Sequence, residues 1–258
     1  MTISVKKRNG DTASLDLERV HHIVEHACNG LAGVSESAVE MNSGLQFFDG
    51  IETKDIQEIL IRSANDLITL ENPNYQFVAA RLLLFGLRKS VYKGHPDNHP
   101  ILKDHVEKCI NLKVYDSEIL RKFTDEEWGV LNSYIDHDRD YLFTYAGMRQ
   151  VCDKYLVQDR SSGEIFETPQ FMYIMIAATL FQDDDKFYRL DYIKKYYDAI
   201  SKHKINIPTP VMAGVRTPIR QFASCVLVDI DDTLDSIFSS DMAIGKYVAQ
   251  RAGIGINA

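Results

Sequence analysis

The sequence predicts a mainly helical protein of the α+β class. Apolar residues recur at helical spacing through most of the 258 residues. Near the N-terminus, short alternating runs flank Asn9-Gly10, a dipeptide that is a strong signal for a β-hairpin. After Ile207 the helical spacing of apolar residues ends, and several prolines and a strand–helix–strand pattern follow. This pattern indicates the beginning of an α/β unit.

Composition and charge exclude several classes of protein. Hydrophobic residues make up 45% and charged residues 26% of the chain, as in ordinary globular proteins. The net charge is −8 and no long Lys/Arg run occurs, so we expect no nucleic-acid partner. The N-terminus lacks the apolar stretch of a signal peptide, and no apolar run is long enough to span a bilayer. We therefore expect a cytoplasmic protein without a membrane partner.

The four cysteines, Cys28, Cys109, Cys152 and Cys225, are far apart in the sequence. None forms a Cys-x-x-Cys pair, so neither a disulfide framework nor a zinc site is indicated, and we expect no metal in this chain. This usage favours a reducing compartment. A buried cysteine is usually a small inert hydrophobe, and we expect that role for the first three.

Residues 1–92 are predicted to form a β-hairpin followed by a four-helix cluster. Ile3 and Val5 alternate before the turn, and Leu15 follows it. Asp16 is placed to cap the first helix, and Thr53 is placed as the N-cap of the third. Proline at a first helical position predicts that the fourth helix starts at Asn72-Pro73. The helices are expected at about 17–29, 35–47, 53–67 and 73–89.

Residues 93–206 are predicted to form a second, helical region. Glycine and two prolines in 93–100 mark its beginning. A short hairpin is expected where Tyr155–Val157 and Ile165–Glu167 flank Ser161-Ser162-Gly163. Helices are expected at 101–112, 116–121, 124–134, 140–150, 169–181 and 186–203.

Residues 207–258 begin with an irregular loop that contains Pro208, Pro210 and Pro218. A buried strand is expected over 224–228. A helix is expected over 233–250 and a second strand over 254–256.

The N-terminal turn carries residues that suit a nucleotide. Lysine and arginine at Lys7 and Arg8 can hold a triphosphate, and the open backbone of Gly10 lets phosphate oxygens approach. Thr53 and Lys89 are placed at helix ends, where they could complete such a pocket. On its own this turn is also compatible with an ordinary solvated loop.

Several motifs in order carry a resemblance to a known family. The chain resembles the large (alpha) subunit of class Ia ribonucleoside-diphosphate reductases, and residues 1–92 resemble the ATP-cone, a regulatory nucleotide-binding domain. The resemblance rests on these stretches: Val5–Gly10, Asp49–Thr53, Tyr75-Gln76, Ala79–Arg81, Arg88-Lys89, Ile135–Asp140, Lys154–Val157, Pro208–Pro210, Gly214–Pro218, Gln221–Cys225 and Arg251–Ala258. It is closest to the bacterial and phage branch. The fold it implies is an ATP-cone over 1–92, a helical domain over 93–206 and the first strands of a ten-stranded α/β barrel over 207–258.

The resemblance also implies site residues. Cys225 is expected to be one of two redox-active cysteines, paired with a cysteine outside this chain. The residues expected to bind substrate are Thr209, Ser224, Cys225, Ala252 and Gly253. The residues expected to bind ATP or dATP are Lys7, Arg8, Ala13, Ser14, Leu15, Asp16, Leu17, Glu18, Arg19, Thr53 and Lys89. The residues expected to bind a specificity effector are Asp232, Thr233 and Leu234.

Around the proposed nucleotide pocket, three positions depart from many relatives. Ala13 stands where they carry an acidic residue, Arg19 where they carry lysine, and Gln57 where they carry histidine.

The activity implied is reduction of ribonucleoside diphosphates to deoxyribonucleoside diphosphates by thiyl-radical chemistry. ATP, dATP and deoxynucleoside triphosphates would act as allosteric effectors. The implied partners are a small subunit with a di-iron tyrosyl radical, thioredoxin or glutaredoxin as reductant, and a second large subunit in a dimer.

The family's radical cysteine, second redox cysteine and shuttle cysteines would all follow Ala258. Three explanations are open: a naturally split subunit completed by a C-terminal fragment, a truncated or partial chain, and a sensing module that acts alone. The absence of a tag or linker disfavours an engineered chain. We favour the split subunit, which we expect to be inactive by itself. The alternative function is a non-catalytic ATP/dATP-sensing regulator, but such a regulator has no use for a substrate-pocket cysteine.

Overall fold

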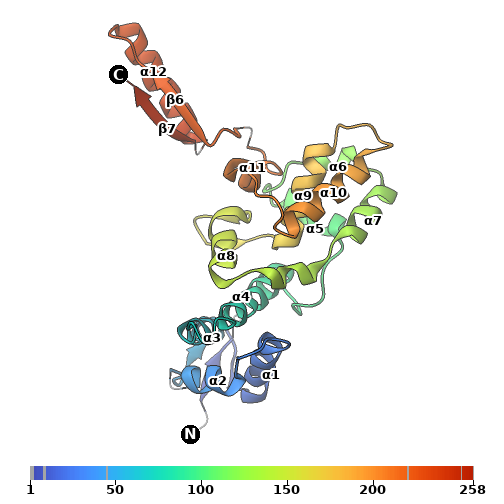
Figure 1. Ribbon diagram of the computed structural model, residues 1–258, viewed down its shortest axis with the longest axis vertical. Coiled ribbons are helices and arrows are strands. Elements are labelled where there is room, and N and C mark those ends of the chain that lie inside the picture. The colour runs from blue at the N-terminus through green and yellow to red at the C-terminus, as the bar shows by residue number, and fades with distance from the viewer. Residues whose placement is uncertain (1–2, 8–9, 45, 220, 251, 258) are drawn as a thin grey trace. The chain divides into compact units, whose positions relative to one another are not determined.

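The computed structural model describes residues 3–7, 10–44, 46–219, 221–250 and 252–257, and it is mostly helical (Figure 1). The chain forms two compact units. Unit 1 contains residues 1–99 and 136–154, and unit 2 contains residues 100–135 and 155–258. The predicted domain limits at 92 and 206 stay predictions. The division into units shows in addition that residues 136–154 pack with the N-terminal region.

The small sheet of unit 1 confirms the predicted hairpin. Strand β1 (Ser4–Lys6) pairs antiparallel with β2 (Thr12–Ser14), with Val5 opposite Ala13. Gly10 in the turn has a φ of 92°, which a glycine adopts without strain. Strand β3 (Ile51–Glu52) adds parallel to β1 and was not predicted, since two residues carry no alternation signal.

Four helices of unit 1 follow the predicted order: α1 (Leu17–Cys28), α2 (Glu36–Gly44), α3 (Thr53–Asp66) and α4 (Tyr75–Tyr92). Asp16 caps α1 as predicted, because its Oδ1 accepts a hydrogen bond from the amide of Arg19 at 3.0 Å. Two predicted starts were wrong. Glu52, held extended in β3, is the N-cap of α3, so Thr53 is the first helical residue.

The start of α4 also differs from the prediction. Pro73 precedes the helix, where its carbonyl accepts from the amide of Gln76 at 3.2 Å in a three-residue turn. Asn74 is therefore the N-cap, and α4 begins at Tyr75.

The second segment of unit 1 is broken into three short helices, where one helix over 140–150 was predicted. They are the 3₁₀-helix η1 (His137–Leu142), α8 (Tyr145–Gln150) and the π-helix η2 (Val151–Tyr155), whose last residue is counted with unit 2. The break has a local cause, because the Thr144 hydroxyl caps α8 by accepting from the amide of Gly147 at 3.3 Å.

The helices of unit 2 mostly confirm the prediction: α5 (Leu102–Asn111), α6 (Ile119–Lys122), α7 (Asp125–Tyr134), α9 (Pro169–Phe181) and α10 (Arg189–Ser201). The prolines after Ile207 do not exclude a helix: α11 (Thr209–Gly214) lies in the predicted irregular loop. Pro210 is tolerated because it occupies the first turn, where no intrahelical N–H is required.

The predicted hairpin of unit 2 is present but displaced. Its strands are β4 (Gln158–Asp159) and β5 (Glu164–Ile165), which pair antiparallel. Glu167, which was predicted in the second strand, is instead fully buried, and its Oε1 accepts from the amide of Val157 at 2.6 Å.

A buried ion pair lies in the core of unit 2. Arg216 Nε donates to Glu167 Oε2 at 2.8 Å, and both side chains are fully buried. The Tyr115 hydroxyl also donates to this carboxylate. Arg216 further donates to the carbonyls of Met212 and Tyr155, at 2.6 and 3.0 Å. Every charged oxygen and nitrogen in the pair therefore has a partner, as a buried pair requires.

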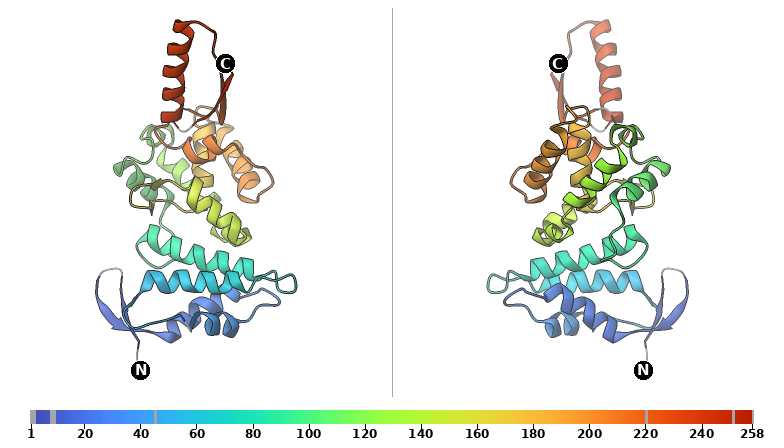
Figure 2. Two further views of the ribbon diagram at one scale, coloured as in Figure 1. Left: turned by 90° about the vertical axis from the view of Figure 1, so that its left-hand side faces the viewer. Right: turned by 90° about the vertical axis from the view of Figure 1, so that its right-hand side faces the viewer.

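The strand–helix–strand unit confirms the predicted elements. Strand β6 (Cys225–Asp229) and β7 (Gly253–Asn257) are parallel, and α12 (Leu234–Ala249) connects them (Figures 1 and 2). Burial of β6 was predicted wrongly. Val226 and Val228 are half-buried, whereas Cys225 is exposed and Leu227 is 85% exposed. The described sheet has two strands and packs against α12, so the face that carries Cys225 is open to solvent.

Among the residues that the structure describes, no helix is both long and apolar enough to cross a membrane.

Glu167→Gln should destabilise unit 2 by about 3–5 kcal/mol, because it leaves the buried Arg216 charge uncompensated. Urea unfolding followed by the fluorescence of Trp128, the single tryptophan and a buried residue of unit 2, measures the loss. Asp191→Asn is the matched control. It removes an exposed ion pair with Lys195 and should cost less than about 1 kcal/mol. Equal losses in the two variants would contradict the argument.

The stability of unit 2 should fall as the pH drops from about 6.5 to about 4. His105 is buried and stacks on Phe171 with ring centroids 4.3 Å apart, and burial lowers the pKa of its imidazole to about 4. Since the unfolded state takes up this proton at a higher pH, acid favours unfolding across that interval. Urea titrations of His105→Gln between pH 4 and 7 should give a shallower pH dependence than the parent chain. An unchanged slope would be evidence against this assignment.

Candidate nucleotide pocket and cysteine site

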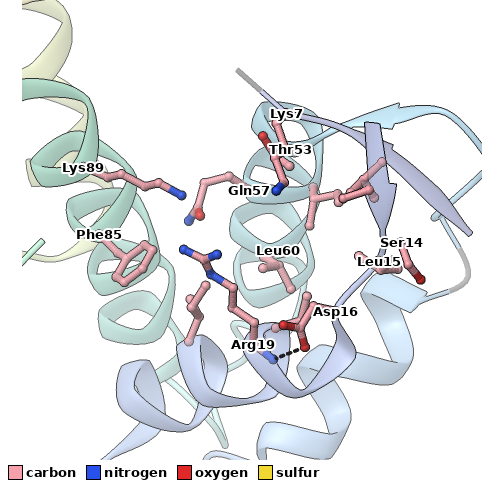
Figure 3. Close-up of a pocket in the computed structure, with 15 residues that line it drawn as sticks. Lys7, Ser14, Leu15, Asp16, Arg19, Thr53, Gln57, Leu60, Phe85 and Lys89 are labelled. Atoms are coloured by element: carbon pink, nitrogen blue, oxygen red, sulfur yellow. Dashed lines mark hydrogen bonds between the residues drawn. The ribbon is translucent and has the colours of Figure 1, made fainter. Parts of the chain in front are cut away.

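Unit 1 contains a cavity of about 360 Å³ between the hairpin and helices α1, α3 and α4 (Figure 3). Its lining residues come from every element of the N-terminal region except α2 and β3. They are Val5, Lys7, Ala13, Ser14, Leu15, Asp16, Arg19, Val20, Ile23, Thr53, Ile56, Gln57, Leu60, Phe85 and Lys89.

Most residues predicted to bind ATP or dATP line this cavity. They are Lys7, Ala13, Ser14, Leu15, Asp16, Arg19, Thr53 and Lys89. Leu17 and Glu18 line a neighbouring groove beside α2 instead, because successive helical residues turn by about 100° and only every third or fourth shares a face. Arg8 lies outside the described residues.

The cavity is electropositive. Three cationic side chains extend toward it: Lys7, which directly follows β1, Arg19 on α1 and Lys89 on α4 (Figure 3). Asp16 is the single carboxylate among the lining residues, and its Oδ1 already accepts the amide of Arg19. Helix α3 also begins at Thr53 on the cavity wall, and a helix N-terminus favours an anion. The arrangement suits a polyphosphate.

Much of the lining is apolar. Val20, Ile23, Ile56, Leu60 and Phe85 offer a surface against which a flat base can bury its faces. Apolar walls with a few placed polar groups are typical of small-molecule sites.

Seven lining residues were absent from the predicted binding set: Val5, Val20, Ile23, Ile56, Gln57, Leu60 and Phe85. Gln57 lies one helical turn after Thr53, and Phe85 lies one turn before Lys89, so helical spacing from predicted residues could have found both. Gln57 is fixed, because its Nε2 donates to the carbonyl of Leu82 at 2.7 Å. It also closes over Gly86, where a Cβ would lie 3.2 Å from Gln57 Cγ.

The cysteines fall into two groups. Cys225 is exposed on β6, whereas Cys28, Cys109 and Cys152 are buried. Burial raises the pKa of Cys28 to about 11 and the pKa of Cys109 and Cys152 to about 12. Because the thiolate is the reactive form, the three buried thiols are chemically inert at neutral pH.

The structure brings four of the predicted substrate residues together. Cys225 lies opposite Gly253 in the β6–β7 register, and the amide of Gly253 donates to the carbonyl of Ser224 at 3.2 Å. Ala252 precedes Gly253 in the chain. Thr209 is the first residue of α11. A Cβ at Gly253 would lie 3.2 Å from the Ser224 carbonyl, so glycine keeps the backbone beside Cys225 accessible.

The predicted specificity residues lie at the start of α12. Thr233 caps the helix by accepting from the amide of Ser236 at 3.2 Å. The Ser236 hydroxyl in turn accepts from the amide of Asp231 at 2.9 Å, which orders the turn around Asp232. Asp232 and Leu234 are both exposed, and Leu234 is 71% accessible to solvent. Across the described part of the chain, no cluster of His, Cys, Asp and Glu is arranged to hold a metal ion.

Two family models match parts of this chain. Residues 3–90 match the family model of the ATP cone domain, and residues 141–220 match that of the ribonucleotide reductase all-alpha domain.

Three curated relatives illustrate the likeness. The chain is 51% identical over 257 residues to the ribonucleoside-diphosphate reductase subunit alpha of Haemophilus influenzae. It is 50% identical over 254 residues to ribonucleoside-diphosphate reductase 1 subunit alpha of Escherichia coli, and 42% identical over 257 residues to the subunit alpha of Enterobacteria phage T4.

These alignments cover 100%, 98% and 99% of this chain but 34%, 33% and 33% of the three relatives. The chain thus spans about a third of their length. The matched ATP-cone, the matched all-alpha domain and the identity across the whole chain lead to one conclusion. This chain belongs to the ribonucleoside-diphosphate reductase alpha-subunit family and corresponds to an N-terminal part of such a subunit.

Proposed function

We propose that this chain supplies the regulatory nucleotide pocket and one redox cysteine of a reductase that converts ribonucleoside diphosphates to deoxyribonucleoside diphosphates. The observation that carries the proposal is the exposure of Cys225 beside the open backbone of Gly253, while the other three cysteines are buried. Only an accessible thiol can approach a ribose and later exchange with an external dithiol.

The redox step balances with a second cysteine from the remainder of a large subunit. The two thiols lose two electrons and two protons and form a disulfide. The substrate accepts the electrons, its 2′ hydroxyl leaves as water and a hydrogen takes its place. A small subunit with a di-iron tyrosyl radical would initiate the reaction, and thioredoxin or glutaredoxin would reduce the disulfide. The chain would therefore be inactive alone and would require a complementing C-terminal portion.

The pocket in unit 1 would bind ATP or dATP as an effector. Lys7, Arg19 and Lys89 would contact the phosphates, and the apolar wall around Phe85 would receive the base. At the start of α12, Asp232 and Thr233 would contact a deoxynucleoside triphosphate where two large subunits meet. Exposed apolar residues on α12, such as Phe238 and Met242, suit that dimer contact. The absence of paired cysteines suits a reducing, cytoplasmic compartment.

The second candidate is a non-catalytic sensor of ATP and dATP. The nucleotide cavity favours it, because all of its lining residues lie in unit 1 and it does not depend on Cys225. Loss of turnover on substitution of Cys225 distinguishes the reductase from the sensor.

Lys89→Gln should raise the Kd of the chain for ATP and dATP by about tenfold or more, because it removes a charge-assisted contact to phosphate. Lys7→Gln should act similarly. Isothermal calorimetry on the full chain measures both. Lys195→Gln, on an exposed face of unit 2, is the control and should bind like the parent. Absence of binding to the parent chain at millimolar nucleotide would contradict the proposed pocket.

Cys225→Ser should abolish CDP reduction with a dithiol reductant when the chain is co-expressed with a complementing C-terminal portion and supplied with the small subunit. The native chain should also show one fast-reacting thiol with a chromogenic disulfide, and this thiol should disappear in Cys225→Ser. Cys28→Ala is the control, since it removes a buried thiol and should leave the fast-reacting thiol in place. Turnover that persists in Cys225→Ser would refute the catalytic role.

A further inference from the structure

The segment 137–154 contacts each of the three helices that form the nucleotide cavity. Its contact with α4 is an ion pair: Arg88 Nη2 donates to Asp140 Oδ2 at 3.0 Å and to the carbonyl of His137 at 2.6 Å. Arg88 is 2% and Asp140 is 1% exposed. A buried, charge-assisted contact of this kind holds η1 firmly against α4.

The contact with α3 comes from α8. Arg149 Nη2 donates to Glu58 Oε2 at 2.9 Å, and both side chains are partly exposed. Solvent screens this pair, so it can break and reform more readily than the Arg88–Asp140 pair.

The contact with α1 comes from Tyr141. Its ring lies 6.3 Å from the imidazole of His26, measured between centroids, in an edge-on arrangement. The guanidinium of Arg81 lies 5.2 Å from the same ring and also donates to the carbonyl of Asn29, at 2.7 Å, just beyond the end of α1. Tyr141 is thereby held by α1 and α4 together.

On α3 and α4, the contact to the segment lies next to a residue that lines the cavity. Arg88 is adjacent to Lys89 on α4, and Glu58 is adjacent to Gln57 on α3. Arg81 lies one turn before Phe85. A ligand that shifts Lys89 or Phe85 therefore acts on α4, the helix that the segment contacts through Arg88 and Arg81.

The segment is also continuous with the other unit at both of its ends. Residues 136–154 belong to unit 1, but Ile135 and Tyr155 on either side belong to unit 2. The all-alpha family model starts at residue 141, inside this segment. Part of the reductase domain is thus built into the nucleotide-binding unit.

We propose that segment 137–154 is a positioning part of the nucleotide-binding unit, and that nucleotide occupancy alters this segment and through it the chain of unit 2. The inference rests on the proposed function of the cavity. Effector control requires that the ligand interact differently with two arrangements of such an element. The exposed Glu58–Arg149 pair is the contact at which those arrangements would differ.

The test uses the full chain and ATP as the probe. Glu58→Gln and Arg149→Gln should each weaken ATP binding by about fivefold in calorimetry, although neither side chain lines the cavity. The swapped double variant Glu58→Arg with Arg149→Glu should recover affinity. Hydrogen exchange supplies the second readout: ATP should slow exchange of amides in 137–154 in the parent and less so in Glu58→Gln. Lys195→Gln should match the parent in both measurements.

Parent-like affinity in both single variants would overturn the inference while leaving the nucleotide pocket intact. Weaker binding without any ATP-dependent change of exchange in 137–154 would also overturn it, since the pair would then be merely structural. A parent chain that binds no nucleotide would instead show that the proposed pocket itself is wrong.

Discussion

Unit 2 depends on the buried ion pair between Arg216 and Glu167. The pair joins parts of the chain that are far apart in sequence: the Tyr115 hydroxyl, the Tyr155 carbonyl and the Met212 carbonyl all bond to it. Removing two charges from water is costly, and attraction offsets that cost only when each polar atom has a partner. The network therefore favours one arrangement of these segments, because other arrangements would leave a buried charge without a polar partner.

The same network fixes how the chain leaves the helical core toward Cys225. The carbonyl of Arg216 accepts from the amide of Asp116 at 3.0 Å, so the backbone is held as well as the side chain. Immediately afterwards the Thr217 hydroxyl donates to the carbonyl of Gly214 at 2.7 Å and accepts from the amide of Ile219 at 3.2 Å. Strand β6 begins a few residues later. The segment that leads to β6 thus starts from backbone held around the buried Arg216, which sequence periodicity does not reveal.

Features with a local cause were predicted, except the break before α8, and features with a distant cause were not. The helical stripes, the Asp16 cap and the Asn9-Gly10 hairpin each depend on neighbours within a few residues. Strand β3, the Glu52 cap that follows from it and the break before α8 depend on pairing or capping without a periodic signal. The packing of 136–154 into unit 1 depends on Arg88 and Arg149, whose partners are over 50 residues away. For the cavity, the family resemblance indicated the cations and drew attention to Gln57, while the apolar wall that includes Phe85 was not predicted.

Exposure of Cys225, contrary to the expected buried strand, has a physical consequence for the site. Cys225 and Leu227 share the open face of β6, opposite Gly253 and Gly255 of β7. A Cβ at Gly255 would lie 2.6 Å from Leu227 Cδ2, so the Leu227 side chain occupies space that a side chain at position 255 would need. The two glycines leave backbone rather than side chains beside the thiol. The proposed substrate would then lie against the sheet within reach of Cys225, which a strand of larger residues at those positions would prevent.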